Sequence, residues 1–170
     1  MTRVQTHLQY GGLTGLAMVI VMVGLYVAGL SFESWSQWIT YIPFLAGLIM
    51  NALAYAKAND YRITFGNVFG SCFKATAIIT LVLLAWGVLS TLIFPEMREK
   101  GLEIARERMM QDPNMTEETV DTALQMTDKF FLPFMIAGIV FGNLFFGAIF
   151  SLIAAAIPKK KGDGMPPIAQ

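Results

Sequence analysis

Four long apolar stretches divide this chain of 170 residues, and most of its polar residues lie between them. Because about 20 consecutive apolar residues cross the hydrocarbon core of a bilayer, each stretch has the length and composition of a transmembrane helix. The pattern therefore predicts an all-α integral membrane protein built as a bundle of four transmembrane helices. We expect the spans at about residues 8–30, 35–56, 67–94 and 131–157.

The first apolar stretch follows Arg3 and runs from Leu8 to Phe32, so a signal peptide has to be considered. Its length far exceeds the roughly 7–15 residues of a signal core, and no A-x-A cleavage pattern ends it. We therefore expect a retained first helix within a single membrane domain over residues 1–158. Residues 159–170 are predicted to form a disordered cytoplasmic tail.

The polar segment from 95 to 130 has the composition of soluble helices. Good helix formers come first, Pro113 interrupts them, and Thr116 is placed to cap a second helix. Apolar residues recur at helical spacing in both halves, which predicts a helical hairpin between the third and fourth spans. Because Pro95 and Pro133 lie where the hairpin meets the spans, we expect kinks there and a bent stalk.

The apolar residues that recur along the two hairpin helices leave two interpretations open. In the first, the apolar residues only hold the two helices together. In the second, methionines on the outer surface also dock a partner, since methionine is adaptable and common at such surfaces. These methionines are Met97, Met109, Met110 and Met115.

Lysine and arginine residues indicate the orientation, because the short cytoplasmic segments of membrane proteins carry an excess of them. The basic residues that flank the spans fall on one predicted side: Arg3, Lys57, Arg62, Lys159, Lys160 and Lys161. The segment from 95 to 129 carries more acidic than basic residues and is predicted to be external. The prediction is a multi-pass protein of the bacterial inner membrane with both termini in the cytoplasm.

Small residues four positions apart predict where the spans pack, because they let helix backbones approach closely. Three such glycine pairs occur, and we expect all of them at helix contacts: Gly11 and Gly15, Gly66 and Gly70, and Gly138 and Gly142.

Asn51 and Asn143 are the strongest hydrogen-bonding side chains within the predicted spans. An amide in hydrocarbon has to find a partner, so we expect each to bond across the bundle. A role in binding a substrate or an ion is the alternative for either residue.

Lys74 interrupts the third apolar stretch close to its predicted inner end. Its ammonium is expected to extend to the inner headgroups, as long basic side chains near helix ends do. The alternative is a cationic rim for lipid phosphates, which Lys74 would form together with Lys57, Arg62 and the cluster of Lys159, Lys160 and Lys161.

Composition excludes several classes of protein. Charged residues make up 14% of the chain, against about 25% in soluble domains, and the net charge is zero. The charge balance speaks against nucleic-acid binding, and a single cysteine and a single histidine speak against a disulfide framework and a histidine metal centre. We expect no catalytic residue, no cofactor and no metal, because no motif for any of them occurs.

Several segments resemble the DUF4199 family of four-helix membrane proteins from Bacteroidetes-type bacteria. They are YGGLTGLAMVI near the N-terminus, residues 61–70 at the inner turn, the Glu/Met-rich hairpin, and GNLFFGAIFSLIAAAIPKKK near the C-terminus. The resemblance covers nearly the whole chain and implies no activity or catalytic residue. It does imply an accessory role beside membrane glycosyltransferases that act on polyprenyl carriers.

Two functions follow as hypotheses. The first is a non-enzymatic accessory or scaffolding subunit of an envelope-associated complex, such as a polyprenyl-linked glycosyltransferase. The second is a small oligomeric transporter or lipid-carrier flippase. Both imply membrane lipids and either a protein partner or a homo-oligomer as binding partners, and neither implies nucleic acid.

Overall fold

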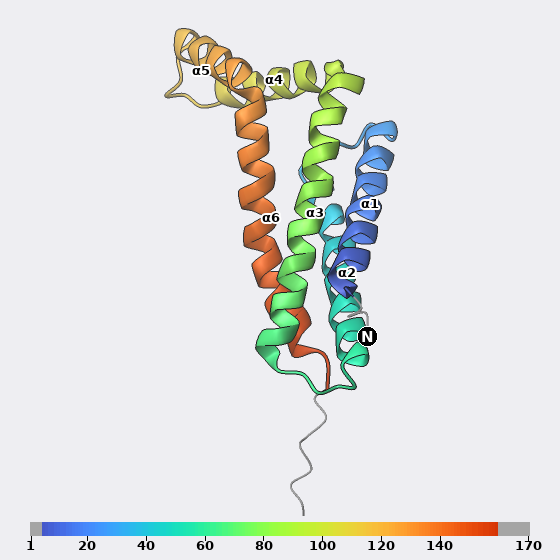
Figure 1. Cartoon of the computed structure of the whole chain (residues 1–170). Coiled ribbons are helices and arrows are strands. Elements are labelled where there is room, and N and C mark those ends of the chain that lie inside the picture. The colour runs from blue at the N-terminus through green and yellow to red at the C-terminus, as the bar shows by residue number, and fades with distance from the viewer. Residues whose placement is uncertain (1–4, 160–170) are drawn as a thin grey trace, which may run out of the picture.

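The computed structural model describes residues 5–159, and within that range the chain forms six α-helices. They are α1 (Thr6–Val27), α2 (Ser36–Ala58), α3 (Phe65–Ile93), α4 (Pro95–Met110), α5 (Glu117–Lys129) and α6 (Phe131–Ala156). Helices α1, α2, α3 and α6 are long and apolar enough to cross a membrane, which confirms the predicted all-α fold with four apolar spans. They form a bundle, and α4 and α5 lie across one of its ends (Figure 1).

Helix α3 is the centre of the bundle, because it contacts each of the other three long helices. Its buried residues recur every three or four positions and so form one continuous stripe: Val68, Ser71, Cys72, Ala75, Thr76, Ile79, Thr80, Leu83 and Gly87. Helix α2 contacts α1 on one side and α6 on the other, whereas α1 and α6 make no contact in the described part of the chain. The four spans therefore form a ring in the order α1, α3, α6, α2.

The two ends of the bundle carry different segments, which are called here the α2–α3 end and the α4–α5 end. The beginning of α1, the α2–α3 turn and the end of α6 lie at the first, and the α1–α2 loop lies at the second (Figure 1). The α2–α3 turn is tight, since Asp60 and Tyr61 both adopt positive φ angles, of 52° and 60°. Thr64 then caps α3 by accepting a hydrogen bond from the Asn67 amide at 3.2 Å, so the helix begins at Phe65, two residues before the predicted start of the span.

Helices α4 and α5 run antiparallel beside each other. Arg98 near the start of α4 pairs with Asp128 near the end of α5 at 2.7 Å, and Arg106 pairs with Asp121 at 3.0 Å. Val120 on α5 is fully buried. Exposed ion pairs thus join the two helices near both ends of the pair.

The predicted bent stalk is wrong, because the two helices lie crosswise to the bundle (Figure 1). Phe94 and Phe130 leave helical geometry, with φ and ψ of −127° and 67° and of −107° and 21°, so the spans end there. Pro95 opens α4 and Pro133 lies in the first turn of α6, where a missing N–H breaks no helical hydrogen bond. Neither proline therefore kinks a continuous helix.

Candidate functional site

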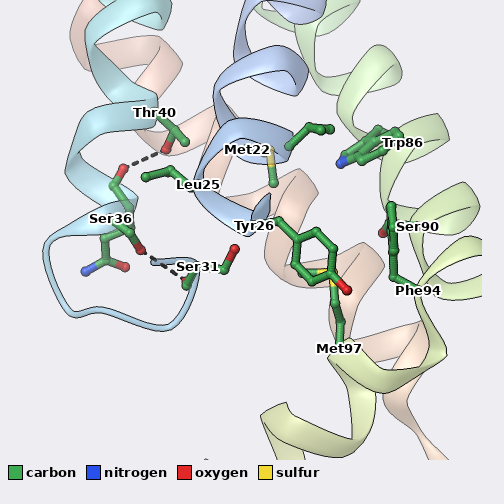
Figure 2. Close-up of a pocket in the computed structure, with 12 residues that line it drawn as sticks. Met22, Leu25, Tyr26, Ser31, Ser36, Thr40, Trp86, Ser90, Phe94 and Met97 are labelled. Atoms are coloured by element: carbon green, nitrogen blue, oxygen red, sulfur yellow. Dashed lines mark hydrogen bonds between the residues drawn. The ribbon is translucent and has the colours of Figure 1, made fainter. Parts of the chain in front are cut away.

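A cavity of about 260 Å³ lies at the α4–α5 end of the bundle (Figure 2). We call it the terminal cavity. Helices α1, α2 and α3 form its walls, and the first turn of α4 closes it through Met97. Its lining residues are Met22, Val23, Leu25, Tyr26, Ser31, Ser36, Gln37, Thr40, Trp86, Ser90, Phe94 and Met97.

Aromatic contacts fix the α3 and α4 side of the terminal cavity. The rings of Tyr26 and Phe94 lie 4.6 Å apart between centroids, and the rings of Trp86 and Phe94 lie 6.5 Å apart. The Tyr26 hydroxyl donates a hydrogen bond of 2.5 Å to Glu96 on α4. That bond, with smaller help from Lys100, holds the pKa of the Glu96 carboxyl below its usual value. Tyr26 thereby ties the end of α1 to the start of α4.

The hydroxyl groups around the terminal cavity donate hydrogen bonds to backbone carbonyl oxygens. Ser36 donates to Glu33 at 2.8 Å, Thr40 to Gln37 at 2.6 Å, and Ser90 to Gly87 at 2.8 Å. Each of these oxygens keeps lone pairs as acceptors. The Gln37 amide and the Trp86 indole N–H add donors to the same lining.

A second cavity of about 360 Å³ lies between the four spans, and we call it the lateral cavity. It shares Met22, Thr40, Trp86 and Ser90 with the terminal cavity, so the two adjoin. The side formed by α6 consists of Met135, Gly138, Ile139, Gly142 and Asn143. Gly138 is exposed and Gly142 is half-buried, so the lateral cavity reaches the surface of the bundle beside α6.

Among the described residues that line these two cavities there is no lysine, arginine, histidine or carboxylate. The lining is thus uncharged, with hydroxyl, amide and indole groups set among apolar side chains. Pockets of this type, mostly apolar with a few converging polar groups, are the usual form of small-molecule sites.

Asn51 and Asn143 have different surroundings. Asn51 is fully buried, and its amide nitrogen donates to the Ser71 hydroxyl of α3 at 3.2 Å, so a bond across the bundle is present. Asn143 donates to the Ile139 carbonyl of its own helix at 2.8 Å. The predicted bond across the bundle is therefore wrong for Asn143, because α6 leaves open space beside this residue and the lateral cavity occupies it.

The three predicted glycine pairs also differ. A Cβ at Gly11 would lie 2.9 Å from the Ala75 carbonyl oxygen, and one at Gly15 would lie 2.8 Å from Val82, so this pair lies at a tight contact between α1 and α3. A Cβ at Gly66, Gly70, Gly138 or Gly142 would meet nothing within 4 Å. Among residues 5–159, these four glycines therefore do not lie at tight contacts.

Two tight glycine contacts were not predicted from the sequence. A Cβ at Gly47 would overlap the side chain of Thr14, and one at Gly87 would lie 2.9 Å from Ile139. Neither glycine belongs to a pair spaced by four, so the spacing gave no signal. The contact of Tyr26 with Glu96 was also missed, because 70 residues separate the two in the chain.

The predicted headgroup residues within the described range are exposed. Lys57, Arg62 and Lys159 lie at the α2–α3 end, and Lys57 borders an open groove between α1 and α2 with Tyr10 and Tyr61. Lys74 is exposed on α3, about 14 Å along the axis from the start of that helix at 1.5 Å per residue. Lys160, Lys161 and all of the predicted tail except Lys159 lie outside the described residues.

Comparison with known proteins gives a family. No curated protein and no solved structure matches the chain. Within residues 5–159, no group of three or more histidine, cysteine, aspartate or glutamate side chains is placed to hold a metal ion. A family model described as "Protein of unknown function (DUF4199)" matches residues 9–160, which confirms the resemblance seen in the sequence. Since this match covers most of its length, the chain belongs to the DUF4199 family.

Proposed function

We propose that this protein is a non-enzymatic, multi-pass accessory or scaffolding subunit of an envelope-associated complex in the bacterial inner membrane. A polyprenyl-linked glycosyltransferase is the kind of partner that the family resemblance suggests. The observation that carries the proposal is an unpartnered row of aromatic residues on α6.

Helix α6 is the span least covered by the rest of the chain. Only 11% of the residues in its most apolar stretch are buried, whereas the share is 33% in the corresponding stretch of α2. Its buried residues, Gly147, Ser151, Ala154 and Ala155, all lie toward the α2–α3 end. The remaining two thirds of α6 therefore present much of their surface to the surroundings.

Large apolar side chains lie along one face of this exposed part. Phe134, Phe141 and Phe145 are 59%, 75% and 64% exposed, and their spacing of seven and four residues places them on one helix face. Gly138 lies between them on the same face, with open space where a side chain would be. Rings that flank a gap offer knobs and a hole for another helix, and packing of this kind drives helix association in lipid.

The charge distribution supports the proposed orientation. Lys57, Arg62 and Lys159 lie at the α2–α3 end, whereas the acidic α4–α5 pair lies at the other end. The excess of basic residues on cytoplasmic segments therefore favours a cytoplasmic α2–α3 end, with both termini in the cytoplasm.

Crosslinking in native membranes, followed by purification of the tagged protein, tests the proposal. A variant with Phe141→Ala and Phe145→Ala is compared with a control that carries Leu13→Ala and Ile20→Ala, two exposed residues of α1. We expect the wild type and the control to retain a stoichiometric partner that the α6 variant loses. The same yield of that partner from both variants, or a clean monomer from the wild type, would contradict the proposal.

The second candidate function is a small oligomeric transporter or lipid-carrier flippase. The observation that favours it is the lateral cavity, which holds Asn143 and reaches the surface of the bundle beside α6. Flux measurements in reconstituted vesicles test this function directly, since a transporter has to raise ion or lipid flux above that of protein-free vesicles. Flux equal to the protein-free level at several protein densities would remove this candidate.

A further inference from the structure

The terminal and lateral cavities adjoin, because Met22, Thr40, Trp86 and Ser90 line both. Together they extend from the surface beside Gly138 and Gly142 of α6 to the first turn of α4, where Met97 lines the terminal cavity. From this geometry we infer that the chain binds one uncharged, hydroxyl-headed lipid of the diacylglycerol class, with the headgroup in the terminal cavity and a chain in the lateral cavity. The inference does not depend on the accessory role proposed above.

The size of each cavity supports a shared ligand. Sites for small molecules usually measure about 300–1,000 Å³. The terminal cavity, at about 260 Å³, falls below that range, and the adjoining lateral cavity adds about 360 Å³. A lipid therefore needs both cavities, one for the headgroup and one for a chain segment. The open glycines of α6 let a chain enter from the side without moving a helix backbone.

The charge of the lining selects the headgroup. An ionised phosphate removed from water requires cations or several donors, and neither cavity has a lysine or arginine in its lining. Glu96, at the start of α4, is a carboxylate at neutral pH, as glutamate side chains ordinarily are, and its hydrogen bond from Tyr26 places this negative charge beside the terminal cavity. Both facts disfavour an anionic phospholipid and leave an uncharged headgroup.

The polar groups of the terminal cavity match a hydroxyl and an ester. Ser36, Thr40 and Ser90 have already donated their protons to carbonyls, so their oxygens accept a hydrogen bond from a lipid hydroxyl. The Gln37 amide and the Trp86 indole N–H are donors for an ester carbonyl. A glycerol headgroup with one free hydroxyl and two esters uses both kinds of group.

Tryptophan fluorescence in nanodiscs tests the inference on the whole chain. Replacing the exposed Trp35 and Trp38 by phenylalanine leaves Trp86, which lines both cavities, as the single reporter. Diacylglycerol with brominated chains is titrated as a quencher and compared with phosphatidylglycerol that carries the same chains. We expect saturable quenching by diacylglycerol at a mole fraction about tenfold lower than for phosphatidylglycerol, a factor equal to about 1.4 kcal/mol.

Matched variants link this quenching to the cavity. Gly142→Leu fills the lateral cavity from a position where a Cβ meets no atom, and Gly24→Leu places the same side chain on an exposed face of α1 that lines neither cavity. We expect Gly142→Leu to raise the half-saturating mole fraction about tenfold and Gly24→Leu to leave it unchanged. Ser90→Leu serves as a second blocking variant if Gly142→Leu fails to fold. Equal quenching by the two lipids, or folded blocking variants that behave like Gly24→Leu, would overturn the inference.

Discussion

The contact of Gly147 on α6 with Thr76 on α3 gives the sharpest test of the packing. A Cβ at Gly147 would overlap Thr76 Cγ2 and lie 2.8 Å from Thr76 Oγ1, and Thr76 is fully buried. The Gly147→Ala variant therefore has to separate α3 from α6 or force Thr76 into another rotamer. Insertion of an extra carbon into a packed core costs about 1–3 kcal/mol. Because alanine is also more favourable than glycine in a helix by about 1 kcal/mol, a control for helix propensity is needed.

Gly12→Ala is that control, because a Cβ at Gly12 of α1 meets nothing within 4 Å. We expect the free energy of unfolding of Gly147→Ala to lie about 1–3 kcal/mol below that of Gly12→Ala. Reversible unfolding in mixed micelles with increasing SDS, followed by circular dichroism, measures both values. Thr76→Ala removes the two overlapping atoms and leaves a 3.0 Å approach to Thr76 Cβ, so combining it with Gly147→Ala should restore about 0.5–3 kcal/mol. Equal stability of Gly147→Ala and Gly12→Ala, or no restoration in the double variant, would refute this packing.

Two further predictions concern polar groups. Asn51→Ala should lower the free energy of unfolding by about 1–3 kcal/mol, since it removes a buried side chain and its bond to Ser71, whereas Asn143→Ala should change it by less than about 0.5 kcal/mol. The same SDS titration measures both variants, and equal losses would contradict the assignment of the two amides. The Tyr26–Glu96 hydrogen bond should be present at neutral pH, because a carboxyl with a lowered pKa stabilises the fold while it is ionised. This contribution should begin to fall below about pH 4.3, the ordinary pKa of glutamate, and should be lost once the pH has passed the lowered pKa of Glu96. Spin labels on α1 and α4 should report a wider distance distribution at low pH, and Tyr26→Phe should show that wider distribution already at pH 7. A distribution independent of pH in the wild type would show that the bond does not position α4.

The four spans could be predicted from the sequence because hydrocarbon tolerates few charges, and long uncharged stretches are easily recognised. The ends of the helices were less accessible. Helix α3 begins at Phe65, two residues before its predicted start, because Thr64 caps it through a local hydrogen bond. Its end at Ile93 lies one residue from the predicted end, but no pattern of hydrophobicity encodes the backbone angles of Phe94. The same angles decide that α4 turns across the bundle, so the prolines alone led to the wrong stalk.

The glycine pairs show why contacts are harder to predict than spans. Spacing by four marks a smooth helix face, but it does not say whether another helix covers that face. Gly11 and Gly15 are covered by α3, whereas Gly138 and Gly142 have the same spacing and line a cavity. The cavities themselves could not be predicted, because the lateral cavity is lined by residues from four helices and depends on where α6 departs from the others.

Labelling of single cysteines in spheroplasts tests the central claim, which is that four spans hold the α2–α3 end in the cytoplasm and the α4–α5 end outside it. With Cys72 replaced by serine, one cysteine is introduced at exposed Gln111, after α4, and another at exposed Asn59, after α2. A maleimide that cannot cross membranes should label Gln111→Cys in intact spheroplasts and Asn59→Cys only after permeabilisation. Labelling of Asn59→Cys alone would reverse the orientation, and labelling of both positions in intact spheroplasts would contradict the four-span topology.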